Sequence, residues 1–132
     1  MAQLAAQSQG VEKYGPYGCQ TGQPWSMMLE PCESLCELII KTGAVVTLQC
    51  GEHVTNISGA IGEWHKNVDV TKLKIHTNLC KDGYGPYGGG PYTKYLYDFS
   101  SEVPSNGRVV GFFGTLENNY VQSIGLYVKK EC

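Results

Sequence analysis

The sequence has few charges and no long apolar run, and these two absences exclude several classes of partner. No stretch of about 18 apolar residues occurs, so the sequence predicts no transmembrane helix. Charged residues make up 17% of the 132 residues, the formal net charge is -2, and acids and bases are dispersed. Because nucleic acids and anionic membranes are captured by basic patches, we expect neither partner, and a neutral or weakly charged one instead.

Signals for secretion and for catalysis are also missing. The opening MAQLAAQSQG lacks the basic start and apolar core of an intact signal peptide. No GxSxG nucleophile turn occurs, so a hydrolase hypothesis has only scattered Ser, His and Asp behind it. A metal site that combines histidines with Cys32 and Cys36 is less plausible than a disulfide there. We therefore predict no enzyme, no metal site and no cofactor.

Cysteine, by contrast, is abundant. Six cysteines in 132 residues are unusual for a protein of the reducing cytosol, and an even number of cysteines allows all of them to form disulfides. We interpret the chain as a secreted protein whose signal was removed before this sequence begins, and the sequon at Asn56 is consistent with this. The sequence does not select a pairing, and the last two cysteines are also candidates for a link to another chain. The candidates for disulfides are Cys19, Cys32, Cys36, Cys50, Cys80 and Cys132.

Glycine and tyrosine are also frequent, and they gather in a repeated motif. The chain has 17 glycines and 9 tyrosines, and YGPYG occurs at residues 14–18 and again at 84–88. More glycine and then a proline followed by an aromatic residue come after each copy. Glycine and proline preset turns, and tyrosine suits sheet edges. The motif predicts an internally repeated all-β protein.

The chain divides into a flexible arm at residues 1–13 and one domain at 14–132. Residues 29–41 fit either a helical stripe or a loop and then a strand from 35 to 41, and we favour the strand because β patterns follow. A strand is expected from about residue 53 to residue 57, and the two glycines that follow, Gly59 and Gly62, are expected to break it. Ile124, Leu126 and Val128 alternate and should face inward. Further strands are expected at 45–50, 68–77, 92–99, 108–113 and 121–129.

The second half of the chain resembles the jacalin-related lectins. The likeness lies in KIHTN and in YGPYGGGPYTKYLYDFSSEVPSNGRVVGFFGTLENNYVQSIGLYV, and more loosely in GPYGCQTGQPW and GEHVTNISGAIG. The resemblance implies a β-prism of three Greek-key sheets that binds saccharides without catalysis. Between residues 46 and 51 this chain is shorter than the family pattern by about two strands. One sheet should therefore be trimmed, and its edge is a candidate dimer interface.

The resemblance also implies a sugar site built from three loops. The amide of Gly22 would bind a ring hydroxyl, and Asn67 and Val68 would lie beside the sugar. The family's GxxxD loop aligns with Asn118, Asn119, Tyr120, Val121 and Gln122. Asn118 replaces the glycine and Gln122 replaces the aspartate.

Loss of the aspartate should weaken or alter monosaccharide binding, because a charged acceptor takes the stronger hydrogen bonds. Glu117 would restore a carboxylate if the loop folds back. The family's second, GDVVD-like site aligns with residues 43–47, where both acids are gone, so no site is expected there. The glycines at 88–90 are a different candidate, although in the family this segment is mostly structural.

The sequence thus supports two hypotheses. The first is a secreted lectin that binds neutral glycans or glycoproteins of the mannose/glucose or galactose type and forms a homo-oligomer. The second is a disulfide-linked structural or matrix protein that keeps the prism with weak or no sugar binding. Trp64 is an even choice between ligand contact and packing.

Overall fold

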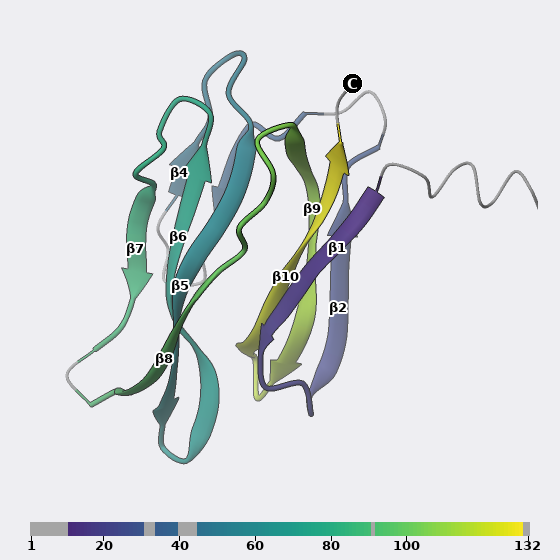
Figure 1. Ribbon diagram of the computed structural model, residues 1–132. Helices are drawn as coiled ribbons and strands as arrows, with labels where there is room; N and C mark the ends of the chain where they lie inside the picture. Colours follow the sequence, from purple (N-terminus) through teal and green to yellow (C-terminus); the bar gives the residue numbers. More distant parts are fainter. Residues whose placement is uncertain (1–10, 31–33, 40–44, 91, 131–132) are drawn as a thin grey trace, which may run out of the picture.

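The described part of the protein is built from β-strands. A computed structural model describes residues 11–30, 34–39, 45–90 and 92–130, and these form ten strands and no helix (Figure 1). In the described residues no helix has the length and apolarity to cross a membrane. The predicted all-β class is confirmed.

The strands form three antiparallel sheets. Sheet A has the order β1-β10-β9-β2, formed by β1 (Val11–Gly18), β10 (Tyr120–Lys130), β9 (Gly107–Glu117) and β2 (Gln23–Met28). Sheet C has the order β7-β6-β5-β8, formed by β7 (Tyr84–Gly88), β6 (Asn67–Thr77), β5 (Val54–Trp64) and β8 (Lys94–Ser100). Sheet B pairs β3 (Glu37–Ile39) with β4 (Val45–Thr47).

The trimmed sheet is sheet B. Each of its strands has three residues, whereas the long central strands of sheets A and C have 11. It still contributes Val46 to the core, where that side chain is 2% exposed. The core otherwise consists of residues from the inner faces of sheets A and C, including Leu126, Val128, Ile57 and Ile61. The inward-facing alternation expected for β10 is confirmed, because Ile124, Leu126 and Val128 are all buried.

The repeated motif occupies matching places in the two large sheets. One copy ends β1, an outer strand of sheet A, and the other is β7, an outer strand of sheet C. Tyr14 and Tyr17 pair with Leu126 and Ile124 of β10, and Tyr84 and Tyr87 pair with Ile75 and Leu73 of β6. Each copy ends in a glycine with positive φ, 115° at Gly18 and 94° at Gly88. The prediction of an internal repeat is therefore confirmed.

Several predicted boundaries were wrong. β5 does not break at Gly59 or Gly62 but runs on to Trp64. A side chain at either glycine would collide with a neighbouring strand, since a Cβ at Gly59 would lie 2.0 Å from the Lys72 carbonyl oxygen and one at Gly62 2.9 Å from that of Lys94. Here glycine permits close strand contact instead of marking a turn.

Three other expectations can be compared with the structure. Among its described residues, the ambiguous segment forms a strand at 37–39, and the strand expected at 45–50 ends at Thr47. The arm was assigned three residues too many, because Val11 to Lys13 already pair with β10. Residues 1–10 of that arm lie outside the described part of the chain.

Candidate functional site

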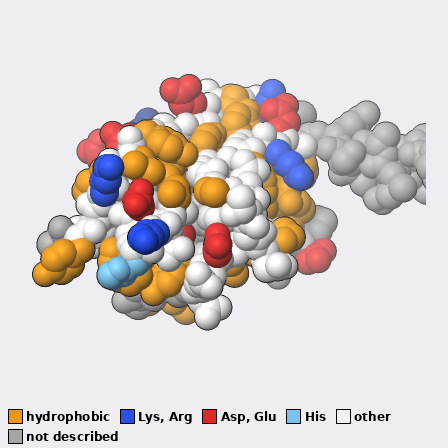
Figure 2. Space-filling view, turned by 90° about the horizontal axis from the view of Figure 1, so that it is seen from below, with side chains coloured by type: hydrophobic (Ala, Val, Ile, Leu, Met, Phe, Trp, Pro, Cys, Tyr) orange, Lys and Arg blue, Asp and Glu red, His pale blue; other side chains and the backbone are white. Residues whose placement is uncertain are grey.

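Three connections meet at one end of the molecule. They are the β1–β2 loop at residues 19–22, the β9–β10 hairpin and the β5–β6 hairpin, all at the lower end of Figure 1. The two hairpins touch through the rings of Trp64 and Tyr120, whose centroids lie 5.7 Å apart. Seen from this end, the surface mixes hydrophobic and uncharged polar groups with scattered acids and bases (Figure 2). Nothing on this face favours a strongly charged partner.

Both hairpins turn through two residues with positive φ. The values are 53° and 67° at Asn118 and Asn119, and 48° and 67° at His65 and Lys66. A two-residue turn of this kind matches the twist of its strands, and asparagine tolerates it better than most residues. The side-chain amides of Asn118 and Asn119 have no hydrogen-bond partner among the described residues and are exposed at the tip. They are therefore free to meet a ligand.

Gly22 and Gln122, 100 positions apart, lie side by side. The Gly22 N–H donates to Gln122 Oε1 at 2.8 Å. Glycine is required there, because a Cβ would lie 2.1 Å from the Leu116 carbonyl oxygen. The same Oε1 accepts the Thr115 hydroxyl at 3.0 Å, and Gln122 is 2% exposed. Gln122 therefore fastens the β1–β2 loop to the hairpin and does not present its carbonyl to a ligand.

A carboxylate occupies the site nevertheless. Glu117 Oε2 accepts Gln122 Nε2 at 2.6 Å and the Thr21 hydroxyl at 3.4 Å. Gln122 Nε2 also donates to Thr21 Oγ1 at 2.9 Å. Glu117 is exposed, and no donor among the described residues reaches its Oε1. Glu117 thus lies against Gln122, the position from which it would restore a carboxylate, while the Gly22 N–H and Gln122 Oε1 are bonded to each other.

The remaining residues of the predicted site differ in exposure. Asn118, Asn119 and Tyr120 are exposed, while Val121 is half-buried beside them. Asn67 and Val68 are half-buried at the start of β6, in the hairpin that contacts the other through Trp64. Thr21 and Thr115 were not predicted as polar partners, because their contacts depend on the β1–β2 loop lying against β9 and β10.

A second polar cluster lies around a buried carboxylate. Glu52, 5% exposed, accepts hydrogen bonds from the hydroxyls of Thr77 and Tyr84 and from the Gln49 N–H. The Thr77 bond, then the bonds from Gln49 and Tyr84, lower the pKa of Glu52. The bond to Glu52 and burial raise the pKa of Tyr84 from 10.0 to about 12. Both carboxylate oxygens accept hydrogen bonds from within the fold, so we interpret the cluster as structural.

The cysteines and the sequon are also located. Cys19, Cys36, Cys50 and Cys80 are free thiols, while Cys32 and Cys132 lie outside the described residues. No group of three metal-ligating side chains occurs in the described ranges. Asn56 is half-buried within β5, and its Oδ1 accepts the Thr55 hydroxyl at 2.9 Å. The disulfide prediction therefore finds no support at the four described cysteines.

Three strand layers with polar loops gathered at one end are the architecture of a β-prism lectin. The family model of the jacalin-like lectin domain matches residues 33–127, and the chain belongs to that family. Its members are lectins, which bind carbohydrate without catalysing a reaction.

Relatives and solved structures agree with this assignment. Over 78 residues the chain is 36% identical to a mannose/glucose-specific lectin of Parkia pendula, covering 59% of this chain and 16% of that protein. It is 34% identical over 90 residues to jacalin-related lectin 24 of Arabidopsis thaliana, covering 64% and 38%. The matched region is thus well under two thirds of these relatives' length.

The fold is similar to that of Calystegia sepium agglutinin, with a TM-score of 0.74, 23% identity and coverage of 91% and 97%. For Malaysian banana lectin the TM-score is 0.71, with 20% identity and coverage of 92% and 100%.

Proposed function

We propose that this chain binds a neutral glycan of the mannose/glucose or galactose type through the β1–β2 loop and the β9–β10 hairpin, without catalysis. One observation carries the proposal: Gly22, Gln122 and Glu117 form a connected, prearranged polar cluster at the end where the loops meet. Groups that are fixed before binding lose little entropy when a sugar arrives. The mannose/glucose-specific relatives from Parkia support the sugar class.

In this proposal Glu117 takes the part that aspartate has in the family motif. Gln122 already accepts two hydrogen bonds through Oε1, whereas Oε1 of Glu117 faces no donor among the described residues. A carboxylate oxygen accepts stronger hydrogen bonds from hydroxyls than an amide oxygen does. The amides of Asn118 and Asn119 would then supply the neighbouring donors. We expect a binding preference altered from that of aspartate-bearing relatives.

A glycan array with wild-type protein and the variants Glu117→Gln and Asn119→Ala tests the proposal. Glu117→Gln should reduce binding about tenfold or more, which corresponds to one charge-assisted hydrogen bond. Glu37→Gln, an exposed acid on sheet B, is the matched control and should bind as the wild type does. Unchanged binding by both loop variants would place the site elsewhere.

The structural or matrix hypothesis makes the opposite prediction for the same array. It expects no glycan to bind and a chain linked to others through its cysteines. Electrophoresis with and without a reducing agent, run beside the array, separates the two. A disulfide-linked oligomer that binds no glycan would overturn the lectin proposal.

We also propose that the chain is secreted and forms a homo-oligomer. The six cysteines and the sequon at Asn56 support secretion, although four of the cysteines are free thiols. Expression through a eukaryotic secretory pathway, followed by glycosidase treatment and light scattering of the purified protein, tests both. A chain retained in the cell and monomeric in solution would contradict them.

A further inference from the structure

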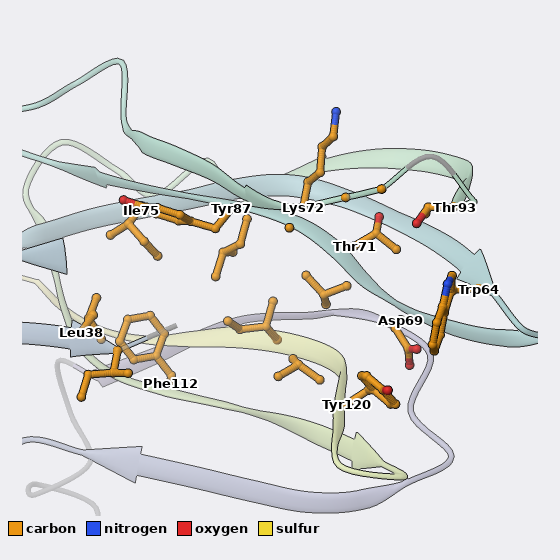
Figure 3. Close-up of a pocket in the computed structure, with 18 of the residues that line it drawn as sticks. Leu38, Trp64, Asp69, Thr71, Lys72, Ile75, Tyr87, Thr93, Phe112 and Tyr120 are labelled. Carbon is orange, nitrogen blue, oxygen red and sulfur yellow. The ribbon is translucent and has the colours of Figure 1, made fainter. Parts of the chain in front are cut away.

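A pocket of about 680 Å³ lies between sheets A and C (Figure 3). Sheet B, reduced to two short strands, borders it only through Leu38 and Ile39. The pocket reaches the surface, since Ile39 on its wall is 72% exposed and Met27 is 39% exposed. Its volume falls within the range of about 300 to 1,000 Å³ that is typical of small-molecule sites.

One end of the pocket is apolar. Figure 3 shows Leu38, Phe112 and Ile75 at this end, with sheet C on one side and sheet A on the other. An apolar group that entered here would leave water on every side. The apolar lining comprises Trp25, Met27, Leu38, Ile39, Leu73, Ile75, Phe112 and Ile124.

The other end is polar and lies where the loops meet. Asp69, Thr71 and Thr93 line it, with Trp64 and Tyr120 beside them (Figure 3). Asp69 is 7% exposed. The nearby Lys72 points away from the pocket, and its Nζ lies 4.6 Å from the centre of the Tyr95 ring. The Thr71 hydroxyl donates to the Ala60 carbonyl oxygen at 3.2 Å, so towards a ligand it can act as an acceptor. The polar end therefore combines hydroxyls with one carboxylate and has no cation directed into it among the described residues.

The internal repeat relates this polar end to the proposed glycan site. A Cβ at Gly18 would lie 2.5 Å from the Gln122 carbonyl oxygen, and one at Gly88 2.4 Å from that of Thr71. Thr71 therefore contacts the last glycine before the glycine-rich β7–β8 loop in the same way that Gln122 contacts the last glycine before the β1–β2 loop. Asp69 comes two residues before Thr71, nearer the hairpin. In both large sheets, polar side chains therefore lie next to a loop that follows a copy of the repeated motif. In sheet C these side chains also border an apolar cavity.

We propose that this pocket binds a neutral amphipathic glycoside. Its sugar hydroxyls would lie at Asp69, Thr71 and Thr93, and its alkyl or aryl aglycone would lie between the sheets. A free sugar would leave the apolar end unfilled. An anionic amphiphile would place its charge against the Asp69 carboxylate, and like charges repel.

One donor in the pocket wall is unpaired. Trp25 lines the pocket, and its indole Nε1 is the one buried side-chain nitrogen or oxygen without a hydrogen-bond partner in the described part of the chain. Buried polar atoms in folded proteins are nearly always paired.

Calorimetric titration with octyl and methyl β-glucosides, and with the corresponding β-galactosides, tests the proposal below the micelle concentration. The octyl form of at least one sugar should bind wild-type protein at least about tenfold more tightly than its methyl form, because about two buried methylene groups already account for that factor. Equal affinities of octyl and methyl forms for both sugars would overturn the proposal. So would equally tight binding of octyltrimethylammonium, which has no hydroxyls.

Two neighbouring methionines provide a matched pair of variants. Met27 lines the pocket, while Met28, 49% exposed, follows it on the same strand and does not. Met27→Glu should abolish most of the octyl advantage, and Met28→Glu should keep it. The same loss in both variants would contradict the assignment.

Thr93→Val tests the polar end of the pocket and should lower the affinity for the octyl glycoside. Thr47→Val, at an exposed position of β4, is the control and should leave that affinity unchanged. Unchanged binding by Thr93→Val would overturn the placement of the sugar. Failure here is distinguishable from failure at the glycan site, because Glu117→Gln should leave the difference between octyl and methyl forms intact.

Discussion

At the scale of single residues, Gln122 shows how a side chain at a binding position can serve the fold. It accepts from the Gly22 N–H and the Thr115 hydroxyl, and it donates to Thr21 and Glu117. Four partners around a side chain that is 2% exposed leave no room for exchange with a ligand. Gln122 stands where the family resemblance implies an aspartate, and Glu117 places a carboxylate next to it.

Gln122→Ala should therefore destabilise the protein by about 1 to 3 kcal/mol, because it leaves the half-buried Gly22 N–H without its acceptor and removes the donor to Thr21 and Glu117. Urea denaturation monitored by fluorescence measures the effect. Gln20→Ala, at an exposed position in the same loop, serves as the control. If both variants unfold at the wild-type midpoint, Gln122 does not hold the loop.

The Glu52–Tyr84 hydrogen bond should make stability depend on pH at both extremes. The pKa of Glu52 is lowered from 4.5, so its contribution is present above pH 4.5 and is lost as the pH falls through the folded-state value. The pKa of Tyr84 is raised from 10.0 to about 12, so its contribution is present below pH 10 and is lost as the pH rises through about 12.

Melting temperatures across these two ranges check the prediction. Tyr84→Phe should lower the melting temperature at neutral pH and flatten its decline between pH 10 and about 12. Tyr92→Phe, where the ring is 85% exposed, should follow the wild-type curve. A wild-type slope retained in Tyr84→Phe would show that another group titrates there.

At the scale of elements, the two glycines that end the repeated motif should be equally intolerant of substitution. Gly18→Ala and Gly88→Ala each place a Cβ against a backbone carbonyl in a left-handed conformation, with φ of 115° and 94°. Each should cost at least about 1 to 2 kcal/mol in the free energy of unfolding. Gly90→Ala is the control, since only the Thr93 hydroxyl lies as near as 4.0 Å.

Denaturant unfolding of the three variants measures these costs. If Gly18→Ala is destabilised while Gly88→Ala unfolds at the wild-type midpoint, the two copies of the motif do not have the same structural role.

The elements also show what a sequence can predict. Strict alternation at residues 124, 126 and 128 identified the inner face of β10, because side chains on a strand alternate between its faces. The same approach was wrong for β5, where glycine meant close approach of strands and not a turn. Whether a glycine bends a strand or admits its neighbour depends on the partner strand, which local sequence does not specify.

At the scale of the molecule, the family resemblance predicted the prism and the trimmed sheet, while the contacts within the site depend on details beyond it. A register shift between Val121 and Ser123 accompanies the turn of Gln122 to the inside. The sequence showed a glutamine where the family pattern has an aspartate. It did not show that this glutamine is buried and bonded to Gly22. The pocket likewise follows from how far sheet B is reduced, a property of the assembled layers.

The oxidation state of the whole chain yields a further prediction. Because Cys19, Cys36, Cys50 and Cys80 are free, thiol titration of protein denatured without a reducing agent should return at least four thiols per chain. Prior reduction is the control and gives the total. A result below four would contradict the structure at these positions and strengthen the case for an oxidising compartment.

The pairing of β1 with β10 has one further consequence. Val11 lies opposite Lys129, and the ion pair between Glu12 and Lys130, at 3.1 Å, links the two strands at the same place. The polypeptide therefore enters and leaves the prism at neighbouring points on one edge. A domain whose two ends lie side by side can be inserted into a longer polypeptide, or joined in tandem with copies of itself, without disturbing the loops at its opposite end.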